Sequence, residues 1–277
     1  MITVTTLSEL RTAIISLPRP LGLVPTMGFL HAGHISLVKA AKAGCASVAV
    51  SIFVNPTQFG PNEDLAQYPR DLPSDLAQLE AAGADLVWTP TPEVMYPSGF
   101  QTWMEVRELA KGLEGALRPG HFRGVTTVVA KLFNAVGPDK AYFGQKDAQQ
   151  AAVIRRMVRD LDFPIEIVVC PIVREPDGLA MSSRNIYLNP EERQAATVLF
   201  RALSAAKVAC EAGEKNGGNL RKIMSDTINA EPLAKLQYVS CTDYDTLEEL
   251  EVVAGKALLS MALYMGKTRL IDNFVIG

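Results

Sequence analysis

Residues 24–34 read Val-Pro-Thr-Met-Gly-Phe-Leu-His-Ala-Gly-His and connect an apolar segment to the helix-like sequence 35–43. This stretch predicts a strand, a tight turn and a helix start. If the helix begins near Gly33, then His31 and His34 both lie at its N-terminus. Unpaired N–H groups and the helix dipole there favour an anion, by about 0.3–1 kcal/mol when exposed and up to ~2 kcal/mol when partly buried. The stretch therefore indicates an anion site, and it holds two of the three histidines in the chain.

Two other interpretations of this histidine pair are open. His-x-x-His is also half of a metal site, but no Cys, Asp or Glu in the next several residues completes a ligand set. The two rings could equally be ordinary helix-start residues whose hydrogen bonds are satisfied within the turn.

Length, composition and charge restrict the class of protein. A chain of 277 residues favours one large or two modest domains, and 48% hydrophobic with 21% charged residues is typical of a globular protein. The net charge of −3 disfavours a nucleic-acid partner but allows small anions to bind beside local basic residues.

The sequence also predicts a cytoplasmic location. Its four cysteines are widely separated, which indicates reduced thiols. The N-terminus carries no targeting pattern, and no run approaches the ~20 apolar residues of a membrane span.

Strands and helices alternate along the first part of the chain. This alternation predicts a doubly wound α/β fold. The expected strands are 2–4, 21–24, 46–54, 85–88, 140–143 and 164–170, with a further possible strand at 103–106; the expected helices are 7–17, 35–43, 75–82 and 125–136, and a helix with a core face at Val153, Ile154, Met157, Val158 and Leu161.

A second domain is expected from residue 176 to residue 277. Helices at 191–212 and 219–230 precede strands at 236–242, 257–265 and 268–275. Helices followed by strands predict a smaller α+β domain, so the division is 1–175 and 176–277.

Polar loops follow several of these elements. Gln58 lies in the loop 55–64, where its amide suits a substrate with hydroxyl and carboxylate groups. Lys146 follows the strand 140–143, and Gln150 lies one turn further on. Ser182, Ser183 and Arg184 together resemble a phosphate clamp. Taken singly, each loop is also explained as an ordinary turn, a surface lysine or a helix-leading serine loop.

His121 and Arg123 are expected just before the helix 125–136. There they would either meet a ligand or serve as a cap and a loop charge.

Five motifs in order carry a resemblance over essentially the full chain. They are P-T-M-G-x-L-H-x-G-H at 25–34, F-V-N-P-x-Q-F at 53–59, R-P-G-H-F-R-G at 118–124, F-G-x-K-D-x-Q-Q at 143–150 and M-S-S-R-N at 181–185. The first contains the H-x-G-H signature of the nucleotidylyltransferase superfamily, and the set resembles the pantothenate synthetase family.

The resemblance implies ATP-dependent condensation of (R)-pantoate with β-alanine through a pantoyl-adenylate, giving pantothenate, AMP and pyrophosphate. It further implies a Rossmann-like N-terminal domain, a smaller C-terminal lid, Mg²⁺ bound through the ATP phosphates, and a homodimer. Gln58 and Gln150 would bind pantoate, and Gln58 would also contact β-alanine. The residues that would hold ATP are Met27, Gly28, Phe29, Leu30, His31, Ala32, Gly33, His34, Gly144, Gln145, Lys146, Asp147, Val173, Met181, Ser182, Ser183 and Arg184.

Within this set, His34 is the residue usually assigned as proton donor. His31, Lys146 and Arg184 join it as candidates for stabilising charge in the reaction. The chain departs from the family pattern at Ala32, where an acidic residue often stands, and at Gln145, where Glu is frequent; we expect these changes to tune the site.

Two alternatives involve different chemistry. The phosphorylated acceptor of a cytidylyltransferase-like enzyme would favour Arg or Lys at these positions, whereas this chain has neutral Gln58 and Gln150. A non-catalytic nucleotide-binding protein would have no need of both histidines together with Lys146 and Arg184.

Overall fold

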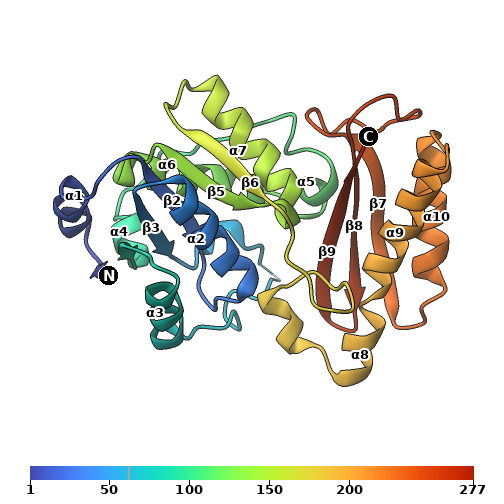
Figure 1. Cartoon of the computed structure of the whole chain (residues 1–277), viewed down its shortest axis with the longest axis horizontal. Helices are drawn as coiled ribbons and strands as arrows, with labels where there is room; N and C mark the ends of the chain where they lie inside the picture. Colours follow the sequence, from blue (N-terminus) through green and yellow to red (C-terminus); the bar gives the residue numbers. More distant parts are fainter. Residues whose placement is uncertain (62) are drawn as a thin grey trace. The chain divides into compact units, whose positions relative to one another are not determined.

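The computed structural model describes residues 1–61 and 63–277 and divides them into two compact units (Figure 1). Unit 1 comprises residues 1–144 and 149–171, and unit 2 comprises residues 145–148 and 172–277. The short segment 145–148 thus belongs with unit 2 although its neighbours in sequence belong with unit 1. Asn62, in the polar loop expected at 55–64, lies outside the described residues. The boundary after residue 175 stays a prediction.

Unit 1 contains a parallel sheet of six strands in the order β1-β4-β3-β2-β5-β6. Strands β3 and β4 follow β2 toward one edge of the sheet, and β6 follows β5 toward the other edge. The strand order therefore reverses between the neighbours β2 and β5. Open α/β sheets bind ligands at the carboxyl ends of the strands at such a point. The strands are β1 (Ile2–Val4), β2 (Leu21–Thr26), β3 (Ser47–Ile52), β4 (Leu86–Trp88), β5 (Lys140–Gly144) and β6 (Glu166–Cys170).

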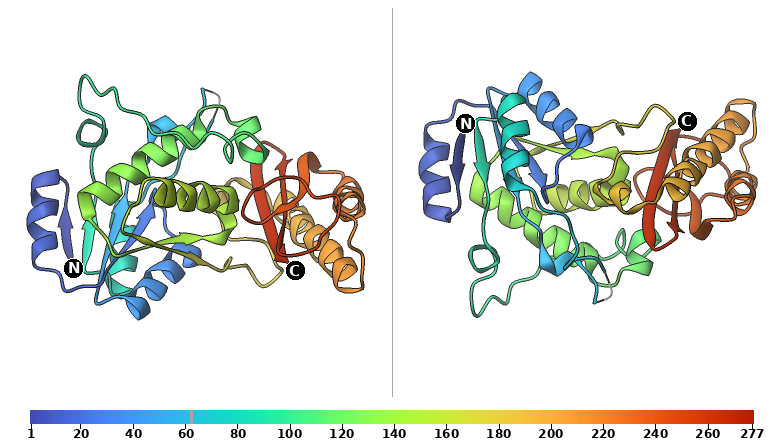
Figure 2. Two further views of the ribbon diagram at one scale, coloured as in Figure 1. Left: turned by 90° about the horizontal axis from the view of Figure 1, so that it is seen from above. Right: turned by 90° about the horizontal axis from the view of Figure 1, so that it is seen from below.

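Helices cover both faces of this sheet, and Figure 2 shows α2 and α6 on opposite faces. Alternate residues of β2 point to the two sides: Leu21 and Leu23 pack in the cluster that includes α6, and Val24 packs in the cluster that includes α2. These features confirm the predicted doubly wound α/β fold. The helices are α1 (Leu7–Ile15), α2 (Ala32–Gly44), α3 (Leu72–Ala81), α4 (Pro92–Met95), α5 (Leu113–Leu117), α6 (His121–Val136) and α7 (Ala148–Asp160), with a 3-10 helix η1 (Pro56–Gln58).

Several expectations for unit 1 are wrong. Residues 103–106 form no strand, because Met104 donates its N–H to the Thr127 hydroxyl and accepts a hydrogen bond from Thr126. Helix α6 begins at His121 rather than at residue 125, after Gly120 in the left-handed conformation. Leu161 lies beyond the end of α7 and is half exposed, so it is not a core residue.

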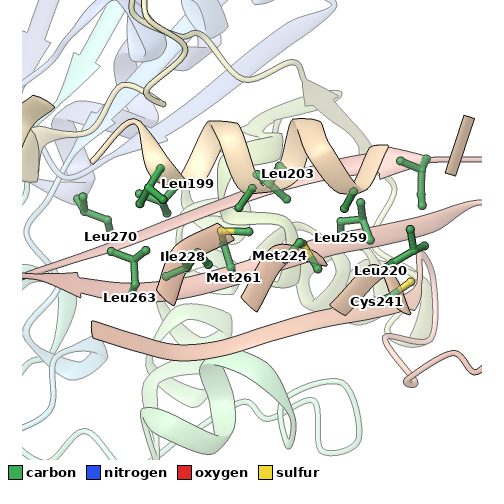
Figure 3. Packing of buried hydrophobic residues seen from close by; sticks show 14 of the residues in the cluster. Leu199, Leu203, Leu220, Met224, Ile228, Cys241, Leu259, Met261, Leu263 and Leu270 are labelled. Atoms are coloured by element: carbon green, nitrogen blue, oxygen red, sulfur yellow. The ribbon is translucent and has the colours of Figure 1, made fainter. Parts of the chain in front are cut away.

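Unit 2 packs two long helices on one face of a three-stranded antiparallel sheet. Leu203 from one helix, Met224 from the other and Met261 of the central strand belong to one buried cluster, which Figure 3 shows. This arrangement confirms the predicted small α+β unit. Its elements are η2 (Gln145–Asp147), η3 (Ser183–Tyr187), α8 (Pro190–Ala195), α9 (Val198–Glu211), α10 (Gly217–Asn229), β7 (Ala234–Asp243), β8 (Ala257–Met265) and β9 (Thr268–Ile276).

The single helix expected at 191–212 is in fact two helices. Helix α8 ends at Ala195 and α9 begins at Val198, with Ala196 and Thr197 forming a turn between them. In the described part of the chain, no helix is both long and apolar enough to cross a membrane.

Candidate active site

The turn between β2 and α2 is held by a buried carboxylate. Asp75 of α3 accepts the N–H of Phe29 at 2.8 Å and that of Leu30 at 2.7 Å. Gly28 has φ of +83°, and a Cβ there would stand 3.0 Å from Asp75 Oδ2. Glycine suits this point, because a side chain would strain the left-handed backbone and would crowd the Asp75 carboxylate. Asp75 thereby fixes the path of the chain into α2.

His31 and His34 lie together at the start of α2. His31 is the N-cap, and its Nδ1 accepts the N–H of Gly33 at 3.1 Å. His34 Nδ1 accepts the N–H of His31 at 3.3 Å, and the two ring centroids are 4.1 Å apart. Because each Nδ1 is an acceptor, the neutral form of each ring carries its proton on Nε2. The pair thus caps the helix and supplies two ring N–H donors where the helix dipole is positive.

Gln58 ends the 3-10 helix that follows β3, and it contacts the β2 loop. Its Nε2 donates to the sulfur of Met27 at 3.1 Å, and its Oε1 accepts from Asn55 at 3.1 Å. The structure thus brings together a predicted pantoate residue and a predicted ATP residue. The carboxyl ends of β3 and β2 are adjacent, which explains the proximity.

A buried histidine and an arginine hold the backbone of Gln58. His121 Nδ1 lies 2.8 Å from the Gln58 carbonyl oxygen, and Arg118 lies 3.1 Å from His121 Nε2. Because Arg118 only donates, Nε2 accepts and Nδ1–H donates to Gln58. Helix α6 approaches closely enough that a Cβ on Gly124 would collide with the Thr57 carbonyl. His121 is thus the first residue of α6 and does not precede the helix, and its side chain supports the backbone of Gln58.

Burial and the ion pair between Arg118 and Glu63 determine the protonation of His121 and Glu63. Burial, together with the Arg118 charge, lowers the pKa of His121 to about 4, so its ring is neutral near pH 7. Burial alone would raise the pKa of Glu63, but its hydrogen bonds to Arg118 and the arginine charge outweigh this and lower the pKa. The pair is bidentate, with both N–O distances 2.7 Å. Arg123 lies elsewhere, with its guanidinium 5.1 Å from the centre of the Trp103 ring.

Two adjacent glutamines of α7 differ in their surroundings. Gln149 is buried and bonds to the backbone of Leu109, Gly112 and Glu114, so it has a structural role. Gln150 is half buried in unit 1. Gly144 ends β5 beside β2, at the same carboxyl edge as the loop that contains Met27.

The segment with Lys146 lies in unit 2. Residues 145–147 form the 3-10 helix η2, and the Lys146 Nζ lies 3.8 Å from Asp147 Oδ1. The side chain of Gln145 is used within the unit, since it donates to Asn273 at 3.0 Å and lies 3.4 Å from the Tyr244 hydroxyl.

Within unit 2, backbone hydrogen bonds join Val173 to the loop 181–184, which contains Ser182 and Ser183. Met181 donates its N–H to the Val173 carbonyl at 3.0 Å, and Arg174 bridges to Ala180. Ser182 caps η3 by accepting the Arg184 N–H at 3.3 Å, and Ser183 is buried. The structure thus gathers the predicted positions 173 and 181–184 into one local loop.

Sequence reasoning missed Asp75 and the support given by Arg118. Asp75 was expected to start a helix, but α3 begins at Leu72 after the Asp71 cap, which places Asp75 one turn inside. The R-P-G-H-F-R-G motif signalled Arg118 and His121 without revealing their contact with Gln58. In the described residues, no three His, Cys, Asp or Glu side chains gather as a metal site.

The comparisons with known proteins begin with a family model. The model of the pantoate-beta-alanine ligase family matches residues 2–275. The chain belongs to this family. It is 63% identical over 273 residues to the pantothenate synthetase of Roseiflexus sp. (strain RS-1), with 99% of this chain and 98% of that relative covered.

Solved structures of the family agree with this membership. The crystal structure of pantothenate synthetase from Thermus thermophilus has a TM-score of 0.95 and 48% identity, with 99% of each chain covered. Pantoate-beta-alanine ligase from Francisella tularensis, crystallised with beta-gamma ATP and beta-alanine, has a TM-score of 0.82 and 38% identity, covering 99% of this chain and 97% of that one. The chain is therefore a ligase, and its reaction is the ATP-dependent condensation of (R)-pantoate with β-alanine.

Proposed function

We propose that unit 1 brings ATP and pantoate together at the β2–α2 turn and that the reaction proceeds in two steps. In the first step the pantoate carboxylate attacks the α-phosphorus of ATP, forming pantoyl-adenylate and releasing pyrophosphate. In the second step the amine of β-alanine attacks the acyl carbonyl, a C–N bond forms, AMP leaves and the amine loses a proton. The observation that carries this proposal is the pair of imidazoles at the N-terminus of α2, next to the loop in which Met27 contacts Gln58.

The first step develops negative charge on the phosphoryl oxygens and on the departing pyrophosphate. Ring N–H donors at a helix N-terminus stabilise that charge more than they stabilise bound ATP. We assign this role to His31 and His34, with His34 as proton donor, and to the cations Lys146 and Arg184.

The remaining proposed contacts follow the family motifs. Gln58 and Gln150 bind the hydroxyl and carboxylate groups of pantoate, and Gln58 also contacts β-alanine. The residues proposed to hold ATP are Met27 to His34, Gly144 to Asp147, Val173 and Met181 to Arg184. Orientation of the two partners accelerates the second step, since well-oriented intramolecular reactions gain ~7–11 kcal/mol.

The residues present fit a Mg²⁺ ion that is held by the nucleotide. Mg²⁺ prefers phosphate oxygens and water to cages made only of protein ligands. When bound, Mg²⁺ would neutralise phosphate charge beside Lys146 and Arg184.

Further features belong to the same proposal. Residues 1–175 form the nucleotide- and pantoate-binding domain, and residues 176–277 form the C-terminal lid. The protein acts as a homodimer in the cytoplasm.

Substitution of Gln58 tests the proposed pantoate contact. The wild-type protein should form AMP and pantothenate only when ATP, pantoate and β-alanine are all present. Gln58→Ala is expected to raise the KM for pantoate by about tenfold or more, because a hydrogen bond to a charged group contributes roughly 1.5 kcal/mol. The KM for ATP should stay within about twofold, because the substitution removes none of the proposed phosphate donors.

Steady-state kinetics with each substrate varied in turn measure both constants. Gln101→Ala, an exposed glutamine of unit 1, serves as the control. Pantoate kinetics unchanged in Gln58→Ala would remove Gln58 from the site.

A further inference from the structure

The segment that carries Lys146 is attached to unit 2 by an asparagine near the end of the chain. Residues 145–148 leave β5 of unit 1, pack with unit 2 and lead back into α7. Asn273 lies on β9, 127 residues away from Lys146 in sequence, and it is 3% exposed.

The amide of Asn273 uses both its donors and its acceptor on this segment. Its Nδ2 donates to the carbonyl oxygens of Gln145 and Lys146, each at 3.0 Å. Its Oδ1 accepts from Gln145 Nε2, also at 3.0 Å. The two carbonyls belong to the peptide planes on either side of the Lys146 Cα. Fixing both planar groups therefore fixes the position of the Lys146 Cα and the direction of its Cα–Cβ bond.

The backbone of Asn273 is itself held by an ion pair in which the Asp272 carboxylate is buried. Arg174 makes bidentate hydrogen bonds to Asp272 at 2.7 and 2.9 Å, and Asp272 accepts the N–H of Asn273 at 2.7 Å. The guanidinium also lies 5.1 Å from the Phe200 ring centre and 4.9 Å from that of Phe274. Since a planar fork paired in this way has little freedom, the position of Asn273 is well defined.

We propose that Asn273 is a positioning residue that holds the Lys146 ammonium in line with the ATP phosphates, so that Lys146 is placed by unit 2. This proposal rests on the proposed role of Lys146 in the reaction. Asparagine suits the position because no other side chain of this size offers two N–H donors and one oxygen acceptor. A positioning error of about 1 Å is enough to cost on the order of a hundredfold in rate.

The strand beside β9 supplies a matched control. Ser260 of β8 pairs directly with Asn273 across the sheet and is also buried, but its Oγ has no hydrogen-bond partner in the described part of the chain. Ser260→Ala therefore alters a buried polar residue of the same sheet without touching the 145–148 segment.

A double-mutant cycle separates positioning from simple stabilisation. Values of kcat and KM are measured for the wild type, Asn273→Ala, Lys146→Ala, the double variant and Ser260→Ala. Asn273→Ala is expected to lower kcat by about 10- to 100-fold while leaving the KM for pantoate within about twofold. In the Lys146→Ala background the same change should lower kcat by less than about twofold, because the group through which Asn273 acts is absent.

A second variant guards against loss of folding. Asn273→Asp keeps the shape and the acceptor for Gln145 but cannot donate to the two carbonyls, so it should show the same loss of kcat and the same dependence on Lys146. Thermal unfolding of each variant, compared with Ser260→Ala, identifies the folded ones.

The results also separate this inference from the proposed function. If Lys146→Ala slows the reaction but Asn273→Ala has no effect, or has the same effect in both backgrounds, only the positioning role is overturned. If Lys146→Ala leaves kcat unchanged, the proposed role of Lys146 fails, and the positioning role fails with it.

Discussion

His34→Ala is expected to lower the rate of adenylation by on the order of a hundredfold or more, as loss of a single catalytic donor typically does. The substitution removes Nε2 of His34. This ring nitrogen carries the proton, because Nδ1 accepts the His31 N–H at 3.3 Å. It also removes a donor from the N-terminus of α2, where charge on the phosphoryl group would be stabilised. Single-turnover formation of pyrophosphate from ATP and pantoate measures this rate directly.

His34→Asn separates the chemical role from the capping role. The asparagine side-chain oxygen can accept the His31 N–H in place of Nδ1, but the variant has no equivalent of the Nε2–H. We expect it to unfold near the wild-type temperature and to be as slow as His34→Ala. An adenylation rate within twofold of wild type in either variant would exclude His34 as proton donor and charge stabiliser.

Asp75→Ala is expected to have the second large effect, a loss of about 2–4 kcal/mol in the free energy of unfolding. The carboxylate is 2% exposed, and its loss deprives two backbone N–H groups, those of Phe29 and Leu30, of this acceptor. Because the turn leads directly to His31, the variant should also have a higher KM for ATP. Chemical denaturation and ATP kinetics provide the two measurements.

Asp71→Ala is the matched control for Asp75. Asp71 is the exposed N-cap of the same helix, and its side chain accepts the Ser74 N–H. Losing such a cap typically costs ~1 kcal/mol. A destabilisation by Asp75→Ala no larger than that of Asp71→Ala would show that the carboxylate does not hold the turn.

Much of the fold follows from local sequence patterns. The apolar run at residues 46–54 predicted a central strand because a strand covered on both faces contains few polar residues, and β3 is buried along most of its length. The expected helix 35–43 lies within α2, which begins three residues earlier at Ala32, and the histidine pair lies at that start because capping depends on neighbouring positions. Local signals of this kind were sufficient to predict the doubly wound sheet.

Contacts between distant parts of the chain could not be predicted in the same way. Asp75 reaches Phe29 and Leu30 across more than forty residues, and no feature near Asp75 reveals that contact. The Trp103 to Val106 segment resembles a strand, yet Thr126 and Thr127 of α6 satisfy the backbone of Met104. The hydrogen bonds of Asn273 to residues 145 and 146 could not be predicted either, because Asn273 lies in none of the five motifs.

The site shows the same division between local and distant information. Its residue types followed from the motifs, and the contact between Met27 and Gln58 follows from the adjacency of β2 and β3. The residues that hold Gln58 in place, Arg118 and His121, were present in a motif, but only the packing of α6 against η1 explains their role.

Exchange of labelled pyrophosphate into ATP tests the central claim most directly. The assay contains Mg²⁺ and pantoate and omits β-alanine, so that only the first step can run forward and back. We expect exchange that depends on pantoate, because reversible formation of pantoyl-adenylate returns the label to ATP. An absence of exchange while ATP still binds would contradict the adenylate mechanism and the roles proposed for His34 and Lys146.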